Sequence, residues 1–215
     1  MKQNSRAAPK LPDSIEKKSW NEAAKDRYIG SCRITDEVIA RGPEETLRFD
    51  QVSFENVTFQ EISWPDSEWL DVQFIGCDLS NADLREAVFR RAEFRECKLI
   101  GTEFTESSMK DVLFEKCIMN YSMFSLSSIE KADFLHSSLR DAEFYEVKLK
   151  QSGFIHCELS GMNLGETELD GVDLSTSTYE SIQVTADKLK GCIVTPEQAI
   201  GFARQLGLII KENDE

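Results

Sequence analysis

The chain has 215 residues, and its 39 Asp and Glu outnumber its 25 Lys and Arg, giving a formal net charge of −14. This acidic balance argues against direct binding of nucleic acid, whose phosphates would repel the protein. The sequence has no apolar run of about eighteen residues and no signal-peptide core, so we expect a cytoplasmic protein that makes no contact with membranes.

Residues 1–46 follow no regular spacing and are predicted to form an N-terminal cap or extension. A capping box from Asp13 to Glu16, ahead of Trp20, predicts a short helix here. An imperfect coil of the following repeat is an alternative for the end of this segment. Its apolar residues Ile29, Ile34 and Ile39 nearly continue the register upstream, although Glu44 breaks it.

Residues 47–194 carry a tandem repeat, because every fifth residue from Phe49 to Val194 is apolar. A small residue stands two places before most of them. A period of five fits neither a flat strand nor an α-helix, so the chain must turn a corner at each repeat. Repetition of this kind predicts a solenoid. A second period of twenty predicts four repeats per turn, and it is marked by Phe54, Phe74, Phe94, Phe114, Phe134 and Phe154.

The repeat unit resembles that of the pentapeptide repeat family, in which a small residue is followed by Asp or Asn and then by Leu or Phe. It is seen in Ala82-Asp83-Leu84, Ala132-Asp133-Phe134 and Val172-Asp173-Leu174. The resemblance implies an all-β fold, a right-handed quadrilateral β-helix with one repeat per face. Between seven and eight coils stacked at roughly 4.8 Å would make a rod on the order of 36 Å long.

Residues 195–215 are predicted to form a C-terminal capping or dimerisation helix and a short strand. Thr195, Pro196 and Gln198 are typical of a helix start, and the apolar run 208–210 could pair as a strand. Two roles stay open, a lid over the last coil and a homodimer contact. The second follows from a resemblance to the dimerisation module of Qnr quinolone-resistance proteins. The candidate dimerisation residues are Ala199, Phe202, Ala203, Leu206, Leu208 and Ile210.

Residue types that carry chemistry are sparse in this chain. Five of its six cysteines occupy the small inward position of the repeat, which is typical of buried, reduced thiols. His136 and His156 lie twenty residues apart and could share a metal, but their column offers no third ligand. Phosphate-binding and nucleophile motifs are absent. We therefore predict a protein that is not an enzyme, with no catalytic, cofactor-binding or metal-binding residues.

The negative charge of the repeat region has the sign needed to occupy a basic nucleic-acid groove on another protein. The Qnr resemblance implies a DNA mimic that engages DNA gyrase or topoisomerase IV, although Qnr proteins have projecting loops and this repeat has no insertion. The alternative is a soluble scaffold or adaptor rod with an unrelated protein partner. A belt of outward apolar residues could dock either the N-terminal segment or a partner. It comprises Leu113, Ile118, Tyr121, Met123 and Leu126.

Overall fold

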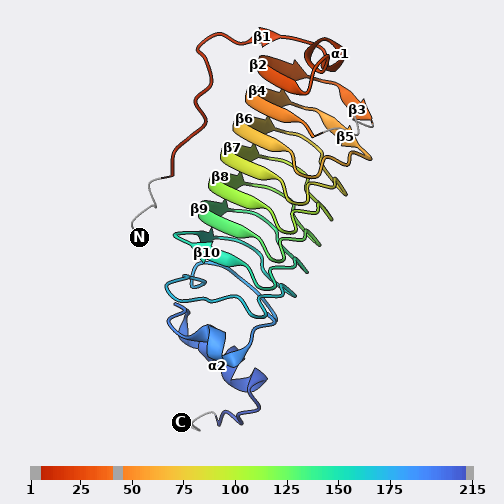
Figure 1. The fold of residues 1–215 in the computed structure, drawn as a ribbon. Coiled ribbons are helices and arrows are strands. Elements are labelled where there is room, and N and C mark those ends of the chain that lie inside the picture. The colour runs from red at the N-terminus through yellow and green to blue at the C-terminus, as the bar shows by residue number, and fades with distance from the viewer. Residues whose placement is uncertain (1–5, 41–45, 212–215) are drawn as a thin grey trace.

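The computed structural model describes residues 6–40 and 46–211 as a rod of stacked coils (Figure 1). One long sheet runs along the rod, and every strand pair in it is parallel. In stacking order it contains β1 (Glu16–Lys17), β2 (Tyr28–Thr35), β4 (Arg48–Glu55), β6 (Glu68–Ile75), β7 (Val88–Arg95), β8 (Ser108–Glu115) and β9 (Ser128–Leu135), followed by β10 (Lys148–Lys150) and β11 (Gly153–Ile155), which both pair with β9. A second sheet joins β3 (Val38–Ala40) to β5 (Thr58–Gln60).

The pairing register confirms the twenty-residue turn, because each residue lies beside the one twenty positions further on. Phe74 pairs with Phe94 and Phe94 with Phe114 on one face. On another face, isolated parallel bridges join Asp83 to Glu103 in the same register. The predicted fold, a right-handed quadrilateral β-helix with helical ends, is confirmed.

The corners of the square are made by residues with left-handed backbone, at every fifth position along the repeat. Positive φ angles recur at Asn56 (53°), Glu61 (50°) and Asp66 (58°). The conformation costs an L-residue about 1–2 kcal/mol, and Gly, Asn and Asp adopt it most readily. In the central coils even Tyr121 (61°) and Leu126 (63°) adopt it. The packing on both sides of a corner therefore overrides the local preference of its residue.

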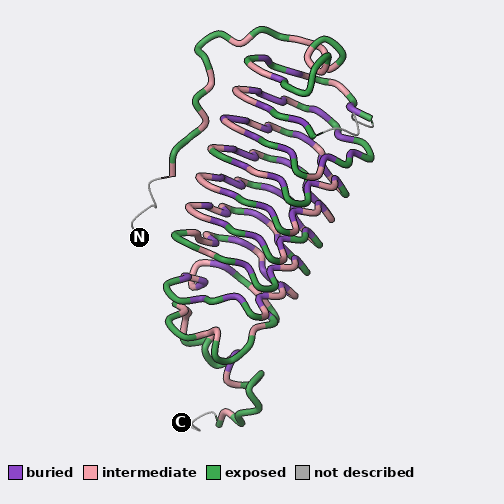
Figure 2. Tube along the Cα trace, in the orientation of Figure 1, coloured by how far each residue is buried: buried purple, intermediate pink, exposed green. Residues whose placement is uncertain are grey.

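Aromatic rings stack along the inside of the rod, where Figure 2 shows the buried positions. Adjacent rings of the column from Phe74 to Phe154 have centroids 4.5–5.0 Å apart and are nearly parallel. This spacing matches the distance between coils and allows offset stacking. Burial of each ring contributes about 1.5–3 kcal/mol, so the column is a main source of stability.

The small inward residues join consecutive coils through hydrogen bonds. Cys97 Sγ donates to the carbonyl of Phe74 (3.5 Å), and Ser127 Oγ donates to that of Phe104 (2.7 Å). Each donor lies 23 residues after its acceptor, so thiols and hydroxyls perform the same task at equivalent sites. All six cysteines are unpaired, and burial raises the pKa of Cys157 to about 11. The Cys157 thiol therefore remains protonated at neutral pH.

The N-terminal end differs from the sequence prediction in its helix. Helix α1 (Trp20–Ala23) is capped by Ser19 and Glu22, so the capping box assigned to Asp13 and Glu16 is wrong. The reason is that Glu16 and Lys17 are extended and pair with β2 as strand β1. The rings of Trp20 and Trp64 stack at 5.4 Å, so α1 covers the end of the aromatic core.

The imperfect first coil is present, and the rod begins at Tyr28, upstream of the boundary expected at residue 47. Ile29 pairs with Phe49 in the sheet, and Ile39 pairs with Phe59. Both isoleucines are buried. Glu44, where the register breaks in the sequence, lies outside the described residues.

The C-terminal end is closed by η1 (Ala186–Leu189) and α2 (Pro196–Gln205). The predicted helix start is confirmed, because Thr195 and Gln198 form a reciprocal capping box. The expected strand over 208–210 is absent, since this run passes beyond the last coil and no described strand lies beside it.

Candidate functional site

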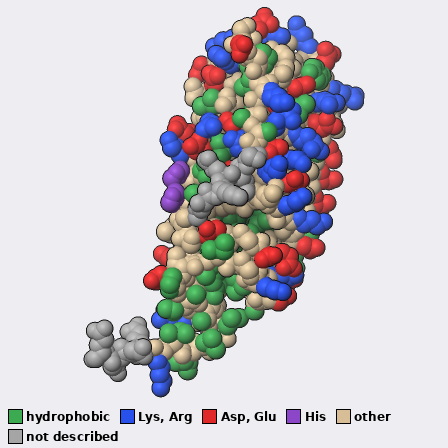
Figure 3. Space-filling model, turned by 90° about the vertical axis from the view of Figure 1, so that its left-hand side faces the viewer, with side chains coloured by type: hydrophobic (Ala, Val, Ile, Leu, Met, Phe, Trp, Pro, Cys, Tyr) green, Lys and Arg blue, Asp and Glu red, His purple; other side chains and the backbone are tan. Residues whose placement is uncertain are grey.

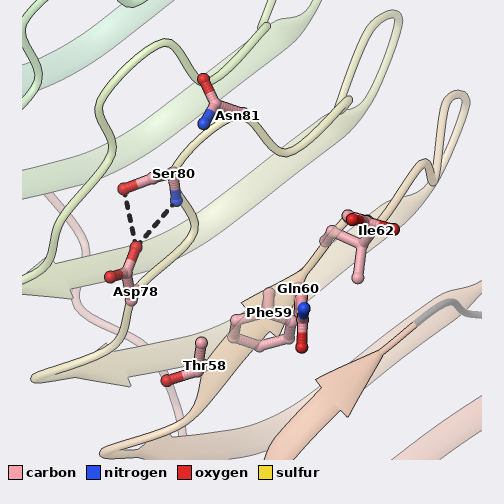
Figure 4. A pocket seen from close by; sticks show the side chains of 8 residues that line it. Thr58, Phe59, Gln60, Ile62, Asp78, Ser80 and Asn81 are labelled. Atoms are coloured by element: carbon pink, nitrogen blue, oxygen red, sulfur yellow. Dashed lines mark hydrogen bonds between the residues drawn. The ribbon is translucent and has the colours of Figure 1, made fainter.

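A shallow hollow of about 480 Å³ lies between two early coils and offers little chemistry (Figure 4). Its lining contains neither His, Cys, Lys nor Arg. Its Asp78 carboxylate accepts hydrogen bonds from the Ser80 hydroxyl (2.7 Å) and the Ser80 N–H (3.0 Å). The Ser80 hydroxyl and the Asp78 carboxylate, which could act as nucleophile and base, are thus hydrogen-bonded to each other. The lining residues are Thr58, Phe59, Gln60, Glu61, Ile62, Asp78, Ser80 and Asn81.

The two histidines stack on adjacent coils, as their spacing predicted, with ring centroids 5.1 Å apart. Figure 3 shows them as a pair on one edge of the rod. Within the described residues, no group of three His, Cys, Asp or Glu side chains is arranged to hold a metal ion. The pair His136 and His156 therefore forms a surface stack with two ligands at most.

Acidic side chains are concentrated on one face of the rod and its adjoining corner, which we call the acidic face. One column is fixed by the bridges from Asp83 through Glu103 to Glu143, and the corner column by backbone bonds between coils. Two cations lie against it: Arg85 lowers the pKa of Asp83 to about 2 through a direct hydrogen bond, and Lys188 lies 3.9 Å from the carboxylate of Glu166. The acidic residues are Asp66, Asp83, Glu86, Glu103, Glu106, Glu143, Glu146 and Glu166.

The next face around the rod mixes both signs, and its charges pair between coils. The Glu130 carboxylate forms ion pairs with Lys110 of the preceding coil (3.2 Å) and with Lys150 of the following coil (3.8 Å). Figure 3 shows blue and red side chains interspersed along the rod. By contrast, the exposed carboxylates of Glu106 and Glu146 make no ion pair within the described chain. The net negative charge is therefore strongly uneven around the rod.

Comparison with known proteins agrees with this architecture. Residues 67–144 match the family described as "Pentapeptide repeat region". Over these residues the chain carries the pentapeptide repeat of that family.

One relative of this repeat protein is the "Uncharacterized protein YisX" of Bacillus subtilis (strain 168), 64% identical over 115 residues. The match covers 54% of either sequence, so the chain spans about half the length of the curated relative it matches. Among solved structures, a trypsin-treated form of QnrB1, a plasmid-mediated fluoroquinolone resistance protein, is 16% identical, with a TM-score of 0.40. That similarity covers 83% of this chain and 100% of QnrB1.

A second similar structure is HetL of the cyanobacterium Nostoc sp. strain PCC 7120, a pentapeptide repeat protein involved in heterocyst differentiation regulation. It is 16% identical, and the similarity covers 81% of this chain and 90% of HetL with a TM-score of 0.38.

The structure divides the predicted apolar belt of the repeat protein. Leu113 is buried, with 4% exposure, on a face crossed by the N-terminal segment. Met123 and Leu126 are exposed within the acidic columns, where they interrupt the run of carboxylates. Ile118 and Tyr121 are exposed on the preceding face. The belt is therefore not one continuous surface.

The predicted dimerisation residues likewise separate into two groups. Phe202 is buried against the rod, 5.9 Å from Tyr179, and Ala203 is half-buried. Leu206 and Leu208 are exposed, as is Ala199, whereas Ile210 is half-buried. Figure 3 shows hydrophobic side chains gathered toward this end of the rod. The chain thus uses one side of α2 as a lid and leaves apolar residues beyond it open.

Residues 6–15, which we call the arm, lie along the outside of the rod, and the sequence did not predict their contacts (Figure 1). Arg6 Nη2 donates to Glu93 Oε1 at 2.8 Å, and both side chains are largely buried. Burial alone would raise the pKa of Glu93, but Arg6 and Arg95 outweigh it and hold the pKa below its ordinary value. At Asp133 burial outweighs the attraction of Arg6, so the pKa of that carboxyl is raised.

Proposed function

We propose that this protein is not an enzyme and acts in the cytoplasm by presenting its acidic face to a basic groove on a protein partner. The observation that supports this proposal is the charge density of that face. Its eight carboxylates, offset by Arg85 and by Lys188 beside Glu166, leave six net charges between the coils of Asp66 and Glu166. Five coil steps of roughly 4.8 Å make this about one charge per 4 Å, close to the axial charge spacing of about 3.4 Å in one DNA strand.

An apolar centre on the same face favours a protein as the partner. Met123 and Leu126 lie in one coil, and the backbone N–H of Leu126 donates to the carbonyl of exposed Tyr145 in the next. Carboxylates of Glu106 and Glu146 lie on either side of Leu126 along the corner column. Apolar contacts surrounded by charged groups are typical of protein interfaces, where a few central side chains provide most of the affinity.

The sequence resemblance to Qnr proteins makes a type II topoisomerase, DNA gyrase or topoisomerase IV, the first partner to test. Under this proposal the acidic face mimics one edge of duplex DNA. The second candidate is a scaffold or adaptor rod, and the apolar centre around Leu126 favours it because DNA offers no equivalent. The two differ in competition, since duplex DNA and high salt should displace only a mimic.

The decisive experiment is supercoiling by purified gyrase with increasing amounts of this protein, with and without a fluoroquinolone. We expect inhibition or drug protection near stoichiometric amounts. The triple variant Glu86→Gln, Glu106→Gln, Glu146→Gln should lose the effect at least tenfold. A matched control, Glu61→Gln, Asp141→Asn, Glu180→Gln, removes three carboxylates that lie outside the two acidic columns, on the preceding corner and face, and should retain it.

Gln is compatible with these corner positions, because Gln51 already adopts positive φ at an equivalent corner. Equal losses in both triple variants would argue for nonspecific charge. If a large excess of the protein has no effect on the topoisomerase, the DNA-mimic proposal is excluded and the adaptor proposal remains. In that case Leu126→Glu should abolish capture of the adaptor's partner without unfolding the rod.

We also propose that two copies associate through their C-terminal ends. Leu206, Leu208 and Ile209 are exposed beyond the lid, with Ile209 at 91%. Sedimentation should show a dimer that Leu208→Glu with Ile209→Glu converts to a monomer. The control Val38→Glu, at an exposed position near the other end, should remain dimeric. A monomeric parent protein would overturn this proposal.

A further inference from the structure

The arm follows a row of rod residues that crosses the coils, and its backbone is in register with them. The N–H of Ala7 donates to Asp111 Oδ1 (3.0 Å), and the N–H of Lys10 donates to Asp71 Oδ1 (2.9 Å). One coil further on, Gln51 Nε2 donates to the carbonyl of Lys10 (3.1 Å). The arm therefore runs antiparallel to the order of the coils.

This register follows from two repeat lengths. Ala7 and Lys10 are three residues apart, which is about 9–10 Å in an extended or polyproline II chain. Asp71 and Asp111 are two coils apart, which is also about 10 Å at the usual strand spacing. Pro9 lies between the two donors, restricts the backbone to extended geometry and brings no N–H that needs a partner. Three residues of any extended chain thus match two coils.

The row beneath the arm is built to accept such a chain, and we call it the axial track. Asp71 and Asp111 lie at left-handed corners, where their carboxylates accept main-chain N–H groups. Arg91 fixes the Asp71 carboxylate with two hydrogen bonds (2.6 and 2.7 Å). Beside this corner row, Glu93 binds a guanidinium and Leu113 adds a buried apolar surface.

The arm makes polar contacts with the rod, and none of its apolar side chains belongs to the hydrophobic core. Ala7, Ala8 and Lys10 are exposed, whereas Pro9, Leu11 and Ile15 are half-buried. Release of the arm would return the carboxylates of Glu93 and Asp111 to water without opening the core. An attachment of this kind can be exchanged for an equivalent segment.

We propose that the axial track is a peptide-binding site and that the arm is its occupant in the isolated protein. The site takes an extended, proline-containing segment of a partner protein, with an Arg directly before the first bonding N–H and a second bonding N–H three residues later. The segment lies across the strands along the rod, so its binding differs from pairing at a sheet edge. This site is separate from the acidic face, and its occupancy does not depend on a topoisomerase.

The test uses a fluorescent synthetic peptide with the sequence of residues 6–15 and the full-length chain. Arg6→Glu places a carboxylate against Glu93 and should release the arm from its own track. We expect this variant to bind the peptide at least tenfold more tightly than the parent chain, whose track is occupied. Ala7→Pro removes one bonding N–H without changing charge and provides an independent release variant.

Matched second substitutions locate the site. Adding Glu93→Gln to Arg6→Glu should weaken peptide binding at least tenfold, whereas adding Glu106→Gln, on the acidic face, should leave it unchanged. Thermal unfolding verifies that each variant is folded. Failure of both release variants to bind the peptide, binding as tight by the parent chain, or an equal loss with Glu106→Gln would overturn the proposal. A dimer of the parent chain that Arg6→Glu abolishes would assign the track to a second copy's arm instead.

Discussion

The central coils and the C-terminal coils share one repeat but differ in how they are held together. Centrally, Phe94, Phe114 and Phe134 stack in a column, and long strands run continuously from β6 to β9. Past Phe154 the column continues as Leu174, and the strands give way to isolated bridges. Several inward residues there are only partly buried, namely Tyr179, Val184, Leu189, Cys192 and Val194.

The corner residues also differ between the central and the C-terminal coils. In the central coils Tyr121 and Leu126 accept left-handed backbone, and glycine makes only the corners at Gly76 and Gly101 in the first coils. In the C-terminal coils glycine is more frequent, at Gly161, Gly171 and Gly191, although Glu166 also adopts left-handed backbone. Glycine meets this backbone without strain, which suits coils that are less well packed. In a solenoid each coil contacts only its neighbours, and stability can therefore vary along its length.

The largest expected effect comes from cutting the aromatic column. Phe114→Ala should lower the free energy of unfolding by about 3–5 kcal/mol, since rings lie on both sides and the cavity cannot collapse. Phe202→Ala in the lid should cost less, about 1–2 kcal/mol, because solvent and α2 can move into the space. Equilibrium denaturation measures both values. Equal losses would contradict the difference between the two regions.

A pair of glycines tests the dependence of the C-terminal coils on special backbone. Gly161 has φ +77°, and a Cβ there would lie near Asp141 Oδ1, so Gly161→Ala should destabilise by about 1–2 kcal/mol. Gly153 has no neighbouring atom within 4 Å of a built Cβ and lies in strand β11. Gly153→Ala should be neutral or stabilising by at most about 1 kcal/mol. The shift in thermal midpoint distinguishes the two.

The lid should be weakened locally by loss of Gln198. Its side chain caps α2 and donates to the carbonyls of Leu174 and Ser177, both at 3.0 Å. Gln198→Ala should cost about 1–2 kcal/mol. Hydrogen exchange should accelerate in residues 174–183 and stay unchanged in β7 to β9. The exposed control Arg204→Ala should alter neither region, and a uniform acceleration would show that the rod unfolds as one unit.

The smallest expected effect is a difference in pH dependence between docking of the N-terminal arm and docking of the C-terminal lid. The arm is bonded to Asp71 and Glu93, whose pKa values lie below normal when it is docked, because Arg91, Arg6 and backbone N–H groups outweigh burial. Docking is therefore favoured above the ordinary carboxyl pKa and is lost as the pH falls through the lowered values, below about pH 4. The lid uses neutral Gln amides, which do not titrate in this range. NMR amide shifts of Lys10 should change with acid, while those of Gln198 should not.

The periodic part of this structure could be predicted from the sequence because one residue pattern repeats under one geometry. Phe54 and Phe74 mark the turn, and Thr195 with Gln198 marks the last helix. The acidic face was also within reach, since Glu86 and Glu106 are twenty apart. Counting charges column by column, instead of along the whole repeat region, would have located it.

The arm could not be predicted in this way. Its contacts join Ala7 to Asp111 and Arg6 to Glu93, and no repeat relates these positions. The repeat places Leu113 outward, yet it is buried, on the face where Arg6 contacts Glu93, its neighbour in the sheet. The short N-terminal helix was misplaced because pairing of Glu16 with the first coil overrode its local capping signal.

The square coil also determines how this chain can change in length. Deletion of twenty residues would remove one coil and shorten the rod by about 4.8 Å, with every remaining column still aligned. Deletion of five would instead turn all later residues by one face, and the carboxylate of Glu146 would no longer follow Glu106. Gene changes in multiples of twenty thus conserve surface patterns, whereas smaller multiples of five preserve the core and rearrange the exterior.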